Sequence, residues 1–275
     1  MTDRMQARAL QIAALADGSI SYVEKGTGTT VVFLHGIGSS ARSWQAAFEV
    51  SPSDWHVMAW NAPGYPPSSP LQAEWPSASD YAERLKALLD ACSMNTVHLV
   101  GHSLGCLMAA RFAKLYPSRT KSLTLASCAI GHARMTEAER DRLLSSRLGD
   151  VAELGPRAMA EKRGPRLLGP KANDEQIRAV VDTMASIDPA GYAQGARMLS
   201  KGDLIGDLET LSRDLPLQFI YGSADVITPH DVNQRAAATR PDAPVTVLQD
   251  AGHACYIEQP QAFINAVQGL VSQHA

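Results

Sequence analysis

The segment between residues 97 and 117 constrains the fold of this chain more than any other part of the sequence. An apolar run, Val97-His98-Leu99-Val100, leads through Gly101-His102-Ser103-Leu104-Gly105 into a helical pattern that reaches Tyr116 and is stopped by Pro117. A serine at a sharp strand-to-helix turn has a strained backbone, and its Oγ projects from the edge of the sheet. The flanking glycines have no Cβ, so strand and helix can approach closely. The pattern predicts an α/β protein with Ser103 as a nucleophile.

The rest of the chain repeats this alternation of strand and helix. Asp17-Gly18 lies between two alternating stretches and predicts an N-terminal hairpin. The later apolar runs suit strands that are buried on both faces, and repeated β-α units predict a mostly parallel sheet covered by helices on both sides. The predicted strands are residues 30–34, 57–60, 97–100, 123–126, 217–221 and 245–248, and helices are expected after Ser39 or Ser40, near 81–89, at 104–116 and near 263–270.

The strand pattern is interrupted between residues 131 and 213. This stretch is charged and helical in pattern, contains three Gly-Pro pairs and shows no strand signal. It lies between two predicted strands of the sheet. We therefore expect a core made of residues 1–130 and 214–275, with residues 131–213 inserted as a helical cap.

A serine hydroxyl is a weak nucleophile at its own pKa and needs a general base. His253 follows the last predicted strand and would lie at the same edge of the sheet as Ser103. The remaining histidines lie in strands, beside helices, in the tail or next to motif glycines, where structural roles are expected: His35, His56, His98, His102, His132, His230 and His274.

The base in turn needs a carboxylate that fixes its tautomer and stabilises the imidazolium. Asp225 follows the strand predicted at residues 217–221, so it should reach the same edge. Asp250 is the alternative, but it is only three positions before His253, where local loop hydrogen bonds are expected. Asp225 gives the order serine, aspartate, histidine that is typical of such a fold.

An oxyanion formed on the substrate would need two backbone N–H donors. Leu104 directly follows the nucleophile, and Ile37 lies in the Gly-rich loop after the strand predicted at residues 30–34. We expect these two groups to form the oxyanion hole. Trp44 and His35 are expected to lie beside the substrate.

Other side chains in the sequence allow more than one interpretation. Lys162, Arg163 and Arg166 in the predicted cap could hold a substrate carboxylate, although a solvated surface is the simpler interpretation. Cys106 and Cys255 are expected to be inert apolar fillers.

Composition restricts the partners of the protein. The formal net charge of the 275 residues is −3, so nucleic acid is not an expected partner. No apolar run reaches about 18 residues, and the N-terminal stretch is too interrupted for a signal peptide, so neither a membrane nor export is expected. The sequence indicates no metal or cofactor, predicts a small-molecule substrate and leaves the oligomeric state open. Scattered cysteines favour free thiols in the cytoplasm: Cys92, Cys106, Cys128 and Cys255.

These motifs together resemble the α/β-hydrolase family over essentially the whole chain. The resemblance is carried by His35-Gly36, the 101–105 motif, Asp225, Gly252-His253 and Glu258-Gln259-Pro260. It implies a cofactor-independent serine hydrolase with a mobile cap. Within the family the chain is similar to 3-oxoadipate enol-lactone hydrolases and related esterases, through Asp188-Pro189-Ala190-Gly191-Tyr192 and the strand at 123–127. It departs from them at Asn61 and Pro66, where the family usually has an acidic residue and a glycine.

Hydrolysis of a carboxylic ester or an enol-lactone is therefore the expected activity. The same residues could support cleavage of a C–C bond in a dienoic ring-cleavage product, or a ligand receptor with a vestigial triad. A dinucleotide site is a further alternative, because Gly36-Ile37-Gly38-Ser39-Ser40-Ala41 fits the G-x-G-x-x-A pattern. The next predicted strand, however, ends at Asn61 where a ribose-binding carboxylate would be expected.

Overall fold

The strands of the protein have apolar side chains on both faces, and this pattern determines the layered architecture. In β3, Val31 and Phe33 belong to one buried cluster, whereas Val32 and Leu34 belong to another on the opposite face. Because successive side chains of a strand point to opposite faces, such a strand is stable only where helices cover both sides of the sheet.

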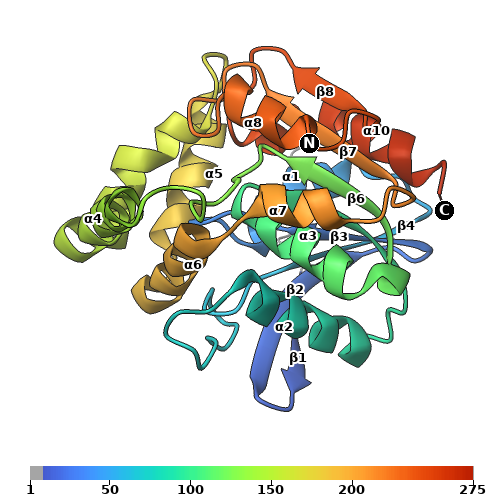
Figure 1. Cartoon of the computed structure of the whole chain (residues 1–275), viewed down its shortest axis with the longest axis horizontal. Helices are drawn as coiled ribbons and strands as arrows, with labels where there is room; N and C mark the ends of the chain where they lie inside the picture. Colours follow the sequence, from blue (N-terminus) through green and yellow to red (C-terminus); the bar gives the residue numbers. More distant parts are fainter. Residues whose placement is uncertain (1–8, 275) are drawn as a thin grey trace, which may run out of the picture.

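The computed structural model describes residues 9–274, and its eight strands form one sheet in the order β1-β2-β4-β3-β5-β6-β7-β8 (Figure 1). β2 pairs antiparallel with both β1 and β4, and all other neighbours are parallel. The predicted parallel sheet with an N-terminal hairpin is thus confirmed. The strands are β1 Gln11–Leu15, β2 Gly18–Lys25, β3 Thr29–Leu34, β4 Trp55–Trp60, β5 Val97–His102, β6 Thr120–Ala126, β7 Leu217–Gly222 and β8 Val245–Leu248.

The hairpin turn lies one residue earlier than the sequence predicts. Leu15 pairs with Gly18, so the connecting residues are Ala16 and Asp17. Gly18 begins β2 with a φ of 132°, a conformation that favours glycine. Residues 1–8, part of the stretch in which no signal peptide is expected, lie outside the described residues.

Helices cover both faces of the sheet. One face carries α2 (Ala78–Ala91), α3 (Leu104–Leu115), α7 (Leu204–Thr210) and α8 (His230–Ala237), and the other carries α1 (Gln45–Glu49) and α10 (Pro260–Val271). The helix expected after Ser39 or Ser40 begins as a 3₁₀ turn at Ala41–Trp44, and Ser40 makes no side-chain cap. A short α9, Cys255–Glu258, follows His253.

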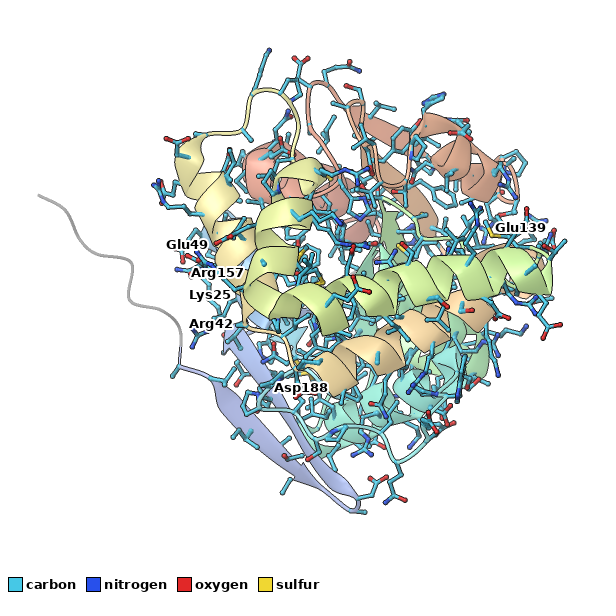
Figure 2. The ribbon with its side chains drawn as sticks, turned by 90° about the vertical axis from the view of Figure 1, so that its left-hand side faces the viewer. Lys25, Arg42, Glu49, Glu139, Arg157 and Asp188 are labelled. Carbon is cyan, nitrogen blue, oxygen red and sulfur yellow. The ribbon has the colours of Figure 1, made fainter. Side chains whose placement is uncertain are left out.

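Between β6 and β7 the chain is helical, as the sequence predicts. This segment contains α4 (Glu137–Arg163), a 3₁₀ turn at Gly164–Leu167, α5 (Asp174–Ala185), α6 (Pro189–Lys201) and α7. α4 bends at Gly155, whose φ is 72°, and Pro156 follows. Figure 2 shows the two arms of α4, with Glu139 near the outer end of the first arm and Arg157 just beyond the bend.

The last helix of this segment lies apart from the others. Asp207 on α7 accepts a hydrogen bond from Arg111 Nε on α3 at 2.9 Å, so α7 packs with the helices that cover the sheet. In Figure 1, α4, α5 and α6 form a separate group beside the carboxyl ends of the strands. A division into core and cap domains at residues 131 and 213 stays a prediction. Among the described residues, no helix combines the length and the apolar character that a membrane span requires.

Candidate active site

Ser103 occupies the turn between β5 and α3. Its φ of 52° and ψ of −115° are unfavourable for a residue with a side chain. The strain is maintained by regular structure on both sides, since Ser103 N donates to Ala126 O of β6 at 2.9 Å and Cys106 N donates to Ser103 O at 3.0 Å. The side chain borders a cavity of about 330 Å³.

The two glycines of the motif allow the close packing that the sequence predicts. A Cβ on Gly105 would lie 2.2 Å from Leu34 O, and a Cβ on Gly101 would lie 2.5 Å from Gly105 O. Both distances are far below van der Waals contact with backbone atoms that cannot move away. The close approach of strand and helix is confirmed, and it fixes the position of Ser103.

His253 and Asp225 are directly hydrogen-bonded at the same edge of the sheet. His253 Nδ1 lies 2.8 Å from Asp225 Oδ2, and both side chains are almost completely buried. Asp225 Oδ1 accepts the N–H groups of Ile227 and Thr228 at 2.8 and 2.9 Å. No hydrogen bond involves His253 Nε2 within residues 9–274, and His253 borders the same cavity as Ser103.

Thr228 is a member of this group that the sequence analysis missed. Its Oγ1 donates to Asp225 Oδ2 at 2.8 Å and lies 3.2 Å from His253 Nδ1. An aspartate whose carboxylate accepts N–H groups two and three residues later forms a local turn, so the Asp-x-x-Thr spacing was a usable signal.

The carboxyl of Asp225 stays ionised although it is buried. Burial by itself raises its pKa, but the charge of His253 and hydrogen bonds from His253 and Thr228 outweigh burial and hold the pKa at about 2. An ionised carboxylate can fix the tautomer of His253 with the proton on Nδ1, which leaves the lone pair on Nε2.

The loop that carries His253 is supported by two further side chains. His102 Nε2 donates to His253 O at 2.9 Å, and Glu258 Oε2 accepts Gly252 N at 2.7 Å. Burial, and to a lesser extent the neighbouring His253, lowers the pKa of His102 to about 3, so His102 is a neutral donor at physiological pH. This contact agrees with the structural role expected for His102.

Asp250, the alternative partner for His253, points to the protein surface. Its Oδ2 forms an ion pair with Lys171 Nζ at 2.7 Å, and the side chain is half exposed. Its backbone lies in the left-handed region with a φ of 63°. Asp250 therefore shapes the turn before His253.

The two predicted oxyanion donors lie together at the cavity. Ile37 and Leu104 both line it, on the loop after β3 and at the first position of α3. Within the described chain neither N–H donates a hydrogen bond to the protein. A Cβ on Gly36 would lie 2.9 Å from Ser103 Cβ, so this loop approaches the nucleophile closely.

Trp44 and His35, expected beside the substrate, lie behind the cavity wall instead. Trp44 is fully buried and stacks on Tyr256 with ring centroids 4.0 Å apart. His35 Nδ1 donates to Gly36 O at 2.8 Å, and its Nε2 accepts Ala62 N at 3.0 Å. Neither is among the described residues that line the cavity, because the loop and Tyr256 cover them. Their position corrects the expectation of direct substrate contact.

The helical wall of the cavity carries most of its charge. Arg163 and Arg166 border the cavity, whereas Lys162 is exposed and pairs with Asp150. Arg147 and Arg235, which no sequence signal separated from other surface arginines, also line it. The simpler expectation of a solvated surface fits Lys162 and Arg166, which are both exposed, although Arg166 also borders the cavity. Arg163 is half-buried and pairs with Asp150.

The structure also shows the surroundings of the two cysteines near the site and of Asn61. Burial raises the pKa of the Cys106 thiol well above its ordinary value and that of Cys255 to about 12, which suits inert fillers. Asn61 is buried, where its Oδ1 accepts Ala41 N and its Nδ2 donates to Ser21 Oγ, both at 2.8 Å. Asn61 therefore holds the loop after β3 in place.

Comparison with known proteins agrees with this geometry. Residues 31–266 match the model of a family described as the alpha/beta hydrolase family. RutD of Escherichia coli O157:H7, a candidate carbamate hydrolase, is 28% identical over 264 residues, which cover 88% of this chain and 91% of RutD.

Two solved structures share the fold. A thermophilic esterase from Thermogutta terrifontis, solved with malate bound, has a TM-score of 0.86 at 23% identity and covers 97% of this chain and 100% of its own. An enol-lactonase from Burkholderia xenovorans has a TM-score of 0.83 at 18% identity, with 95% and 100% coverage.

Proposed function

Because this chain belongs to the α/β-hydrolase family and is a hydrolase of that type, we propose that it cleaves a carboxylic ester or a lactone of a small molecule through Ser103, His253 and Asp225. The observation that carries the proposal is the buried hydrogen bond of 2.8 Å between His253 Nδ1 and Asp225 Oδ2, at the cavity that Ser103 also borders. The similarity to a candidate carbamate hydrolase makes a carbamate a second candidate substrate, because the same three residues could attack its carbonyl group.

In the proposed reaction, Ser103 Oγ attacks the substrate carbonyl while His253 Nε2 accepts the hydroxyl proton. The ionised Asp225 stabilises the resulting imidazolium. The N–H groups of Ile37 and Leu104 bind the oxyanion, and the lack of an acceptor for either group within residues 9–274 supports this role. Collapse of the tetrahedral intermediate transfers the proton from His253 to the leaving oxygen and forms an acyl-enzyme. Water, deprotonated by His253, then releases the acid and restores Ser103.

A fluorophosphonate probe tests whether the nucleophile is activated. We expect covalent labelling of Ser103, located by peptide mass spectrometry, and loss of labelling in Ser103→Ala. Ser118→Ala changes an exposed serine at the opposite end of the sheet and should label normally. An unlabelled Ser103 in folded protein would contradict the proposal and favour a ligand receptor.

A substrate panel tests the type of bond. Aryl esters, enol-lactones, carbamates and dienoic ring-cleavage products should be assayed side by side, with Ser103→Ala as the blank. We expect turnover of esters or lactones, whereas turnover of the dienes alone would assign C–C hydrolysis instead. A small-molecule substrate and a cytoplasmic location belong to the same proposal, and the four free cysteines support the location.

A further inference from the structure

Arg147 is a charged side chain that lines the cavity and has no counterion within residues 9–274. It lies on α4 before the bend at Gly155, and it is half-buried. Its one hydrogen bond within residues 9–274 is a long one, from Nη1 to Tyr192 Oη at 3.5 Å, and it forms no ion pair there. A guanidinium that is partly removed from water is stable only if charged or polar groups compensate it.

The cavity as a whole is also lined by basic side chains without acidic ones among its described residues. Its described lining includes four arginines, Arg147, Arg163, Arg166 and Arg235, and no aspartate or glutamate. Among the residues that the structure describes, Arg163 is the only one of these four arginines that pairs with a carboxylate, that of Asp150. The chain as a whole has 28 acidic and 25 basic residues, so an excess of basic residues does not explain a cavity lined by arginines alone.

The acidic group of the active site cannot serve as the counterion. The carboxylate of Asp225 already accepts hydrogen bonds from Ile227, Thr228 and His253, and it lies behind the imidazole. Asp150, three positions after Arg147 on α4, is engaged by Lys162 and Arg163.

His132 is a polar neighbour of Arg147 at the cavity. Burial, together with the positive charge of Arg147, lowers the pKa of His132, so this neighbour is neutral at physiological pH. His132 Nδ1 is buried and has no hydrogen-bond partner within residues 9–274. Arg147 and the unpartnered His132 Nδ1 thus belong to residues that border the same cavity.

From this arrangement we propose that Arg147 binds a carboxylate of the substrate, so the enzyme acts on esters or lactones that carry a second, ionised carboxyl group. This inference rests on the proposed hydrolysis at Ser103 and specifies its substrate class. The planar guanidinium can donate two parallel hydrogen bonds to a carboxylate, and His132, which also lines the cavity, can contact the same ligand. A neutral substrate would leave Arg147 unpaired. Such a site therefore discriminates strongly between substrates with and without the ionised carboxyl group.

The test uses two esters that differ by one charge, monomethyl glutarate and dimethyl glutarate. We expect the wild-type kcat/KM to favour monomethyl glutarate, after correction for the rates of alkaline hydrolysis of the two esters. Arg147→Met should lower kcat/KM for the monoester about 10- to 100-fold, the loss expected when a hydrogen-bonded charge pair is removed. The value for the diester should change less than about threefold, and Arg147→Lys should restore part of the preference.

Arg142→Met is the matched control, because Arg142 is exposed on the same helix and does not line the cavity. Arg142→Met should leave kcat/KM unchanged for both the monoester and the diester. Equal losses for the two esters in Arg147→Met would assign Arg147 a structural role and overturn the proposal, as would a wild-type preference for the diester. If Arg147→Met fails to fold, inhibition of wild type by glutarate but not by 1,5-pentanediol supports the proposal, and equal inhibition contradicts it.

Calorimetry with Ser103→Ala separates this proposal from the hydrolase assignment. Glutarate should bind Ser103→Ala and bind at least tenfold more weakly to the Ser103→Ala, Arg147→Met double variant. Binding without any ester turnover in wild type would contradict the proposed hydrolysis alone. Turnover of esters without glutarate binding would contradict the carboxylate site alone.

Discussion

The two walls of the cavity are built in different ways. On the strand side, Ser103, Asp225 and His253 are short side chains on a tightly packed backbone, and one hydrogen bond of 2.8 Å connects the last two. On the helical side, long side chains such as Arg147 and Met184 reach into the cavity from α4 and α5. Arg147 has a single long hydrogen bond there.

This difference separates two tasks. Acid–base chemistry requires atoms fixed to within a fraction of an ångström, which a rigid backbone and short side chains provide. Selection of a substrate requires a matching shape and charge, which long side chains on helices can supply and adjust. Figure 1 shows the same division, with the sheet on one side and the group of α4, α5 and α6 on the other.

The largest expected effect is on the strand side. Asp225→Asn should lower kcat about 10³- to 10⁴-fold, because the neutral amide neither fixes the tautomer of His253 nor stabilises its imidazolium. Asp250→Asn, which removes a carboxylate paired with Lys171 at the surface, is the matched control and should keep most of the activity. Steady-state kinetics on any accepted ester measures both. Similar losses in the two variants would remove the distinction between these aspartates.

The second effect tests the rigidity of the strand side. Gly105→Ala should lower the free energy of unfolding by about 3 kcal/mol or more, because its Cβ would lie 2.2 Å from Leu34 O. Gly269→Ala on α10, where a Cβ meets nothing within 4 Å, should not destabilise the protein. Urea unfolding followed by circular dichroism measures both, and a tolerated Gly105→Ala would show that this packing can relax.

A third prediction concerns acid. The pKa of Asp225 is about 2 in the folded protein, below the ordinary 3.8, so its ionisation stabilises the fold above pH 3.8 and this contribution disappears as the pH falls toward 2. The contribution is about 2 kcal/mol, with roughly half of it lost by pH 3. The difference in unfolding free energy between wild type and Asp225→Asn should therefore shrink from pH 5 to pH 3. Parallel pH profiles for the two proteins would contradict the prediction.

The smallest effect is expected on the helical side and has the opposite sign. Gly149→Ala in α4 should raise the unfolding free energy by about 0.5–1 kcal/mol, because alanine loses less conformational entropy in a helix and its Cβ comes no closer than 3.9 Å to the Glu153 side chain. Thermal or urea unfolding would detect it. Destabilisation here would mean that the helical wall is packed as tightly as the strand side.

Local sequence signals determined the elements and the chemistry of the strand side. These signals depend on residues within a few positions of one another. They are the strands buried on both faces, the glycines at 101 and 105, and the residues directly after β5, β7 and β8. These signals predicted the sheet, the position of Ser103 and the choice of Asp225 and His253 as its candidate partners. Even the turn at Asp225, which holds Thr228 against the imidazole, has a local signal.

Tertiary structure decided which side chains line the cavity. The sequence cannot show that Tyr256 covers Trp44, or that Arg147 faces inward while Arg142 on the same helix does not. Those outcomes depend on how α4 bends at Gly155 and packs over the ends of the strands, through contacts between residues far apart in the chain. Periodicity predicts that a segment is a helix, but the direction in which each arginine points depends on the neighbours against which the helix packs.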